Sequence, residues 1–360
     1  MTQPTSNITS AYAVINDGLE NVSSQKALFE AQLAKLSTLG ITPTVLCIDP
    51  LSTPWQSEQA PGHFRSGCAP IMALEHATQL IAQGHPAVII EGEEPLASGY
   101  TREQRHQLMM VYSDQPSIAE LYTRLATQYM AQHQCDESEF INLVDLVFQN
   151  HLSVYQQQSE QNKTHFSLPS SKWFTPVTSL FRGVDCANPL IDFSGKILLC
   201  NDEVTQQLNA LSRIQVAGVS LGIIDTDDEP QAIEKIVKYD HLNTAFTQAC
   251  QQTGIDFVEQ FKQGNALLET YTCYPVVPMA FLTRNGFIDS LAQLPEFLSK
   301  HQITVTGGMN LARAPWNNPS LNALITMFDQ LNTGEKRYGL VHGNGGLGYR
   351  QGVAILKSLQ

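Results

Sequence analysis

Residues 70–94, PIMALEHATQLIAQGHPAVIIEGEE, contain the pair of elements that predicts the fold class. Their first part predicts a helix that ends at Gly84, a usual helix stop, and one stripe of that helix is formed by Ile71, Leu74, Thr78 and Ile81. The run PAVIIEGEE is typical of a buried strand that ends in acidic residues. A helix followed at once by a buried strand is the repeating unit of α/β folds.

The same alternation continues on both sides of this pair. Further helices are predicted at SQKALFEAQLAKLSTLG, SIAELYTRLATQYMAQ, HLNTAFTQACQQTGID and PSLNALITMFDQLNTG. Further strands are predicted at TPTVLCID, GKILLCND, RIQVAGVSLGIID, NALLETYTCYP, QITVTGG, RYGLVHG and GVAILKS. Strands that alternate with helices favour an α/β fold with mostly parallel central sheets.

Composition and charge narrow the class of protein. The chain has 360 residues, of which 42% are hydrophobic and 15% charged, as in soluble globular proteins of one large or two ordinary domains. Its formal net charge of −13 argues against nucleic acid or an anionic membrane as partner, because a polyanion would be repelled.

Targeting signals and cysteine spacing add further expectations. The first ten residues lack the parts of a signal peptide, no apolar run is long enough to span a membrane, and a cytoplasmic protein is expected. The seven cysteines are scattered without a CxxC pair, so neither a disulfide framework nor a metal site is predicted.

One internal segment departs from the acidic character of the chain. Between Glu160 and Asp185 there is no acidic residue, yet basic and aromatic side chains occur at Lys163, Lys172, Trp173, Phe174 and Arg182. This pattern is typical either of a solvated surface loop or of a site for an anionic small molecule.

Cysteine and histidine side chains occur where strands end or helices begin. Cys68, in RSGCAPIMAL, comes just before a predicted helix, where the positive helix end would lower a thiol pKa. Cys273, in YTCYP, ends a strand before another helix, and His342 lies among glycines in GLVHGNGGLGYRQGVAIL, residues 339–356. For both cysteines the alternative is a packed side chain. For His342 it is a tight hairpin.

A fourth stretch, TVTGGMNLARAPWNNPS, carries a Gly307-Gly308 turn and then the polar residues Asn310, Arg313, Asn317 and Asn318. Asparagine-rich loops are commonly turns. The four stretches together suggest a site at the edge of an α/β sheet, where strand ends and helix starts gather. We therefore expect Cys68, Cys273 and His342 to converge on one pocket.

The order of these motifs resembles the thiolase superfamily, in particular its divergent bacterial acetyl-CoA acetyltransferase-like proteins. The resemblance covers nearly the whole chain and is most specific in the last sixty residues, where ITVTGG, a loop, a helix and RYGLVHGNGG follow one another. It implies a thiolase fold of two similar α/β halves, residues 1–205 and 206–360, layered αβαβα. A loop domain inserted at about 102–185 would hold coenzyme A over the active site.

Three motifs depart from the thiolase pattern. The GHP histidine is absent from ARAPWNNP, and the NEAF or HDCF motif is YTCY, in which Cys273 matches the cysteine of HDCF. The late CxG motif appears as HGN, which places His342 where a cysteine usually lies.

The resemblance also implies roles for residues. Acyl transfer through a thioester needs a thiolate, a base and oxyanion donors. Cys68 would carry the acyl group, with His342 as base and Cys273 as a second acid or base. The oxyanion and loop positions would be Gly308, Asn318, Gly343 and Gly346. Coenzyme A would lie against Lys163, Lys172, Trp173 and Arg182.

Two functions follow from this resemblance. The first is an acyl-CoA acyltransferase of lipid metabolism that forms or cleaves a C–C bond through acyl-Cys68, with a coenzyme A thioester as substrate and no covalently bound cofactor. The second is a non-catalytic thiolase-fold protein that binds acyl-CoA or supports a partner subunit. A homodimer or tetramer is implied in both cases. A nucleotide-binding α/β protein is disfavoured because neither GxGxxG nor GxxxxGK[ST] is present.

Overall fold

The computed structural model describes residues 5–16, 23–112, 116–161, 166–210, 212–224 and 232–359. The strands in this part of the chain are β1 (Asn7–Ile15), β2 (Thr44–Ile48), β3 (His63–Phe64), β4 (Ala87–Pro95), β5 (Asp192–Cys200), β6 (Ile214–Ile223), β7 (Ala266–Glu269), β8 (Tyr338–Gly345) and β9 (Arg350–Ser358).

The helices are α1 (Ser23–Thr38), α2 (Ala69–Ala82), α3 (Arg102–Met109), α4 (Ile118–His133), α5 (Glu137–Glu160), α6 (Asp202–Gln207), α7 (Ile233–Ile236), α8 (Asp240–Thr253), α9 (Phe257–Lys262), α10 (Val276–Arg284), α11 (Leu294–Lys300), α12 (Gly308–Leu311) and α13 (Pro319–Thr333). Among the helices, α1, α2, α4, α8 and α13 begin and end close to the positions predicted from apolar periodicity, and the others were not predicted individually. Short 3₁₀ turns lie at Ser171–Phe174, Gly183–Asp185 and Leu291–Gln293.

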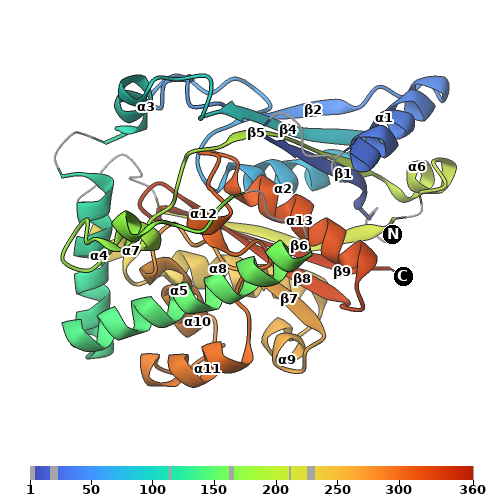
Figure 1. Ribbon diagram of the computed structural model, residues 1–360. Coiled ribbons are helices and arrows are strands. Elements are labelled where there is room, and N and C mark those ends of the chain that lie inside the picture. Colours follow the sequence, from blue (N-terminus) through green and yellow to red (C-terminus); the bar gives the residue numbers. More distant parts are fainter. Residues whose placement is uncertain are drawn as a thin grey trace.

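The nine described strands form one sheet in the order β3-β2-β4-β5-β1-β6-β9-β8-β7. The order β2-β4-β5-β1 in the first half is repeated as β7-β8-β9-β6 in the second, so the two halves are mirrored about the β1–β6 junction (Figure 1). The halves join through a short pairing in which Asn7 lies opposite Gln215 and Ile8 opposite Ile214. This duplication is the two-half arrangement that the sequence predicts.

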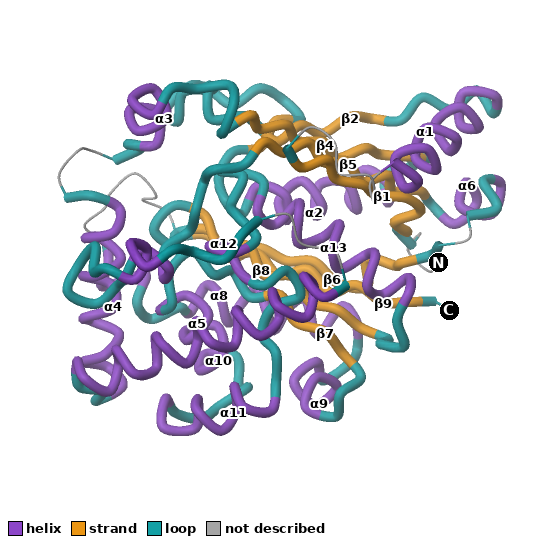
Figure 2. The backbone as a smooth tube through the Cα atoms, in the orientation of Figure 1, coloured by secondary structure: helices purple, strands orange, loops and turns teal. Residues whose placement is uncertain are grey.

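The layers follow the order helix, sheet, helix, sheet, helix (Figures 1 and 2). The helices α2 and α13 lie between the two halves of the sheet and contact strands of both. α1 covers the outer face of the first half, where Phe29 and Leu36 pack against Tyr12 and Leu198. α8 covers the outer face of the second half. The predicted αβαβα layering is therefore confirmed.

The sheet is mixed rather than mostly parallel, which corrects the expectation from the sequence. Parallel pairs are β2–β3, β2–β4 and β7–β8, whereas the pairs around β5, β1, β6 and β9 are antiparallel. Only four residues separate β8 from β9, and so short a turn requires the two strands to run in opposite directions.

The insertion lies between β4 and β5 and contains α3, α4 and α5. Capping boxes start α3 at Thr101 and α4 at Ser117, and the Asp136 carboxylate accepts the N–H of Glu139 to start α5. The insertion occupies the place expected for the loop domain, while the boundary at residues 205 and 206 stays a prediction. Within the described residues, no helix combines the length and apolar character needed to cross a membrane.

Candidate functional site

A cavity of about 220 Å³ lies where the start of α2, the β8–β9 turn and the inserted helix α4 meet. Its walls are largely aromatic and apolar, and the aromatic side chains among them are Trp55, Tyr112, Tyr122, Tyr271, Tyr274 and Trp316. None of its described lining residues is Lys or Arg. A concave, mostly apolar cavity with a few polar atoms is the usual form of a small-molecule site.

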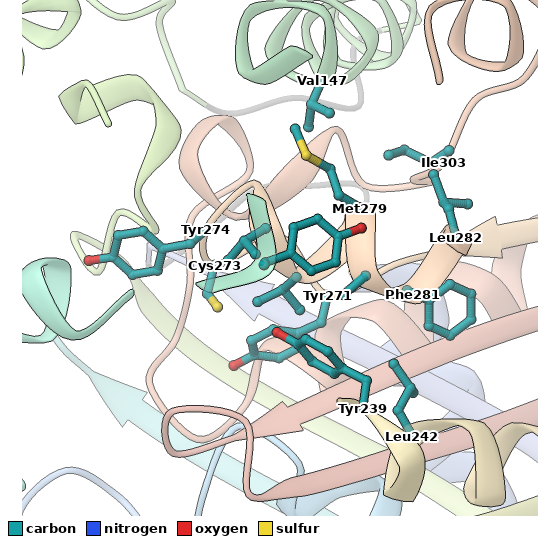
Figure 3. Packing of buried hydrophobic residues seen from close by; sticks show 14 of the residues in the cluster. Val147, Tyr239, Leu242, Tyr271, Cys273, Tyr274, Met279, Phe281, Leu282 and Ile303 are labelled. Atoms are coloured by element: carbon teal, nitrogen blue, oxygen red, sulfur yellow. The ribbon is translucent and has the colours of Figure 1, made fainter. Parts of the chain in front are cut away.

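Cys273 is the predicted catalytic residue that lines this cavity. It belongs to the large buried cluster shown in Figure 3, where its sulfur points away from Met279 and Phe281. The thiol donates to the hydroxyl of Tyr122 at 3.3 Å, and the Tyr122 ring stacks on Tyr274 with centroids 4.1 Å apart. Burial raises the pKa of the Cys273 thiol to about 12, so the group is held as a thiol at neutral pH.

Cys68 is not among the residues that line the cavity. Its side chain is fully buried, and its sulfur lies only 2.8 Å from the point where a β-carbon on Gly352 would stand. The sequence predicts a lowered thiol pKa at this helix start. Instead burial raises the pKa of Cys68 to about 12, with the charge of Arg350 acting in the opposite direction. Desolvation of the thiolate therefore outweighs the helix end.

Gly67 borders the cavity in place of its neighbour Cys68. The preceding Ser66 has φ 136°, a strained value for a residue with a side chain, and its carbonyl accepts the N–H of Ala69. A β-carbon on Gly67 would stand 2.0 Å from the hydroxyl of Tyr271 and 2.4 Å from the carbonyl oxygen of Asn344. Glycine is required at this turn because two other groups fill the space of a side chain.

His342 lies in the interior of β8 and is 1% exposed. Its Nε2–H donates to Oε1 of Gln351 at 2.7 Å, and its Nδ1 accepts the backbone N–H of Tyr271 at 3.3 Å. The ring packs on Phe281 with centroids 4.7 Å apart. Burial lowers the pKa of His342 to about 4. Both ring nitrogens are thus occupied in the neutral form, and the ring is absent from the cavity wall.

A chain of hydrogen bonds connects His342 to the cavity. The Gln351 amide donates to Oδ1 of Asn344 at 2.7 Å, and the Asn344 amide donates to the Tyr122 hydroxyl at 3.1 Å. Tyr122 in turn donates to the carbonyl of Gly346 at 3.1 Å. Every polar group in this chain has a partner, which fixes the shape of the cavity wall.

The predicted convergence of three side chains is therefore only partly seen. Cys273 lines the cavity, His342 reaches it through the Gln351–Asn344 chain, and Cys68 faces the packed interior. The expectation of one shared pocket fails because helix α2 packs directly against glycines of the β8–β9 hairpin. A β-carbon on Gly343 would stand 2.9 Å from Ile71 and 3.3 Å from the Cα of Cys68.

The predicted oxyanion positions are also dispersed. Gly346 lines the cavity and has φ 61°, as its turn requires. Gly343 packs under α2, and Gly308 has φ 84° and lies against His151. Asn318 is fully buried, and neither polar atom of its amide has a hydrogen-bond partner within the described structure.

The basic segment is more neutral than its sequence indicates. Arg182 forms ion pairs with Asp145 and Asp185, each at 2.9 Å, and lies over the rings of Phe148 and Phe174. These aspartates come from outside the acid-free stretch, so the sequence segment alone does not reveal them. Lys172 is exposed, Trp173 packs against Gly183, and Lys163 lies outside the described residues.

Sequence reasoning missed several cavity residues that come from separate loops. Trp55 is positioned by Arg65, whose guanidinium donates to Asp49 at 2.9 Å and to the carbonyl of Trp55 at 2.8 Å. Trp316 lies in the quoted asparagine-rich loop, and Asn344 between two glycines. The two glycines beside Asn344 at the end of β8 were an available signal. No such signal marks Trp55, Trp316 or Tyr122, the last of which is one tyrosine in a helical pattern.

The layered duplicated sheet and the cavity at its edge define a protein of the thiolase fold. The structure is similar to a monomeric SCP2-thiolase-like protein type 1 from Mycobacterium smegmatis, with TM-score 0.71 and 16% identity over 98% of this chain and 77% of that one. It is similar to the Acat5 thiolase from Ascaris suum solved with coenzyme A, with TM-score 0.63 and 13% identity over 99% of this chain and 100% of that one.

A third similar structure is the Ltp2–ChsH2(DUF35) aldolase, with TM-score 0.64 and 14% identity over 98% of each chain. No family model matches the sequence, and no curated protein matches it. At these identities the likeness confirms the predicted fold and nothing finer.

Proposed function

We propose that this protein binds a short acyl group, presented as a coenzyme A thioester, without transferring it through Cys68. The observation that carries this proposal is that Gly67 borders the cavity while the sulfur of Cys68 is fully buried. This is the non-catalytic function among the two that the sequence suggests.

The chemistry of the site supports binding over acyl transfer. A thioester exchange needs an accessible thiolate with a base nearby. The thiols of Cys68 and Cys273 both have a pKa raised to about 12 by burial. The imidazole of His342 has a pKa lowered to about 4 and both nitrogens occupied. This arrangement provides neither group in reactive form.

The size of the cavity supports a short acyl group. An apolar cavity of roughly 150 Å³ accommodates benzene, so a cavity of about 220 Å³ suits an acyl chain of a few carbons. The nucleotide part of coenzyme A would lie outside, because the described lining residues include no cation for phosphate. We assign the Tyr271 hydroxyl, which reaches the Gly67 turn, as donor to the acyl carbonyl.

Acyl-CoA binding can be separated from acyl transfer in one experiment. Butyryl-CoA is titrated against the protein while tryptophan fluorescence reports on Trp55 and Trp316, and intact mass is then measured. We expect saturable binding with no acyl adduct. The variant Ala187→Trp, which fills the cavity, should abolish binding. Ala97→Trp, at an exposed position outside the cavity, should leave it unchanged.

The acyltransferase remains the second candidate function, since Cys273 lies in the cavity wall. A butyryl adduct mapped to Cys273 would favour that function with a different nucleophile, and an adduct on Cys68 would overturn our proposal. The cytoplasmic location, the partner subunit and the homodimer or tetramer stay predictions. The similar Mycobacterium smegmatis protein is described as monomeric, so mass photometry is the direct test of the assembly.

A further inference from the structure

The cavity beside Gly67 has a buried floor and a more exposed rim. Among its described lining residues, Tyr122, Cys273 and Tyr274 are at most 7% exposed, whereas Ile118 is 42% exposed. Trp55, on another loop, is partly exposed as well. Under the proposed function the nucleotide of coenzyme A stays outside the rim, so the far end of the acyl chain comes to lie against the floor.

Two tyrosines from distant parts of the chain form this floor. Tyr122 lies on α4 of the insertion, and Tyr274 lies just before α10 of the second half. Their rings stack with centroids 4.1 Å apart and planes 18° from parallel. Figure 3 shows Tyr274 projecting away from Met279 and Leu282 of α10. The stacked rings therefore present one aromatic wall to a ligand in the cavity.

The hydroxyl of Tyr122 ties this side chain to the surrounding structure. It donates to the carbonyl of Gly346 at 3.1 Å and accepts the Cys273 thiol at 3.3 Å. It also accepts the amide of Asn344 at 3.1 Å. Removal of Tyr122 would leave these buried groups without a partner, so its substitution would change more than the size of the cavity.

Tyr274 separates the cavity from the aromatic core of the insertion. Phe181 packs edge-on against the Tyr274 ring with centroids 5.4 Å apart. Phe181 is 1% exposed, contacts Phe140 in turn, and is absent from the described lining of the cavity. An acyl chain that reaches Tyr274 thus meets close-packed side chains, which leave no space for a further methylene.

We propose that the ring of Tyr274 sets the upper limit on the length of the acyl group that the cavity accepts. This inference rests on the proposed function, because it takes the cavity to be the acyl site. Since benzene occupies a cavity of roughly 150 Å³, about 220 Å³ holds the thioester carbonyl and about four carbons. Loss of the phenol ring would add a space of roughly benzene size, which admits several more methylenes.

The length limit is tested by titrating butyryl-CoA and octanoyl-CoA against the full chain in a calorimeter. We expect the wild type to bind butyryl-CoA at least tenfold more tightly than octanoyl-CoA. Tyr274→Ala should bind octanoyl-CoA at least tenfold more tightly than the wild type does, because each newly buried methylene strengthens binding about fourfold. Its affinity for butyryl-CoA should change much less.

Tyr129 provides the matched control for this substitution. It is fully buried on α4 and is not among the described lining residues, so Tyr129→Ala removes the same side chain without opening the floor. The ratio of the two affinities should then stay at its wild-type value. Tyr274→Leu keeps an apolar contact with Phe181 and should relax the length limit in the same direction, which covers the case that the alanine variant does not fold.

The outcomes separate this inference from the function on which it rests. A wild-type preference for butyryl-CoA that persists in Tyr274→Ala and Tyr274→Leu would overturn the length limit and leave the proposed function standing. Equal binding of both thioesters by the wild type, or the same relaxation in Tyr129→Ala, would also overturn it. Failure of the wild type to bind either thioester would contradict the proposed function, and the length limit with it.

Discussion

The hydroxyl oxygen of Tyr271 lies 2.0 Å from the point where a β-carbon would stand on Gly67. The phenol thus occupies the space of a side chain in the turn before α2, where Gly67 borders the cavity. The nearest thiol, Cys68, is one residue further on and faces the β8–β9 hairpin, so the cavity wall presents a hydroxyl at this point.

Substitution of Gly67 tests this relationship. Gly67→Ala should lower the free energy of unfolding by about 3 kcal/mol, because the new methyl group overlaps Tyr271 and the Asn344 carbonyl. The double variant Gly67→Ala/Tyr271→Phe should recover part of this loss, since one of the two overlaps is removed. Urea unfolding gives the free energy of unfolding of Gly67→Ala, Tyr271→Phe and the double variant. Strictly additive effects of the single changes would show that the residues do not interact.

Thiol labelling tests the burial of Cys68. Cys47 and Cys250 are partly exposed, whereas Cys68 is fully buried with a pKa of about 12. With sub-stoichiometric iodoacetamide at neutral pH, peptide mapping should find Cys47 and Cys250 modified before Cys68. Preferential labelling of Cys68 would restore it as a nucleophile.

The protonation state of His342 is open to direct measurement. Its folded-state pKa of about 4 lies below the ordinary value of 6.5, so the stability that the neutral ring contributes is present above pH 6.5. That stability is lost as pH falls through 4. Nitrogen-15 NMR of the imidazole should show a neutral Nε2–H tautomer from pH 8 to pH 5. Titration of this ring near pH 6.5 would contradict the buried geometry.

Glu269 makes stability depend on pH in the opposite direction. Burial raises its pKa from 4.5 to about 7, although Thr306 and Val305 donate to the carboxylate. The stability that the protonated Glu269 carboxyl contributes to the fold is therefore present below pH 4.5 and is lost as pH rises through 7. Because Glu269→Gln does not titrate, its stability relative to the wild type should increase by about 3 kcal/mol between pH 4 and pH 8. Denaturant unfolding at several pH values measures this difference, and a constant difference would contradict it.

Substitution of Arg182 distinguishes a structural role of this side chain from a role in binding phosphate. Its partner Asp185 is 1% exposed, so Arg182→Gln leaves a buried carboxylate unpaired and should destabilise the fold by about 2 kcal/mol. Lys172→Gln, at an exposed position, is the matched control and should have little effect. Thermal unfolding and coenzyme A titration are measured together. Weaker coenzyme A binding by Arg182→Gln at unchanged stability would support the phosphate role implied by the family resemblance.

Local pattern was sufficient for seven of the nine described strands and for α1, α2, α4, α8 and α13 among the helices. The helical stripe before Gly84 and the β-branched run after it became α2 and β4, and the glycine-rich end of the chain became the β8–β9 hairpin. These elements follow from apolar periodicity and glycine stops, which act within a few residues. QITVTGG is the exception. Its strand pattern is overridden by hydrogen bonds to the carboxylate of Glu269, which accepts the N–H of Val305, 36 residues away.

The orientation of the reactive side chains follows from packing between distant segments. Gly67 and Cys68 lie in the turn before α2, so which of them borders the cavity depends on how the start of α2 packs against Gly343 and Gly352. In the same way, His342 faces the interior because α10 brings Phe281 onto that face of β8. The chain's periodicity and motif order specify the thiolase fold. Which thiol is buried, and what pKa it has, are set by contacts between residues hundreds of positions apart, because desolvation depends on the whole surrounding structure.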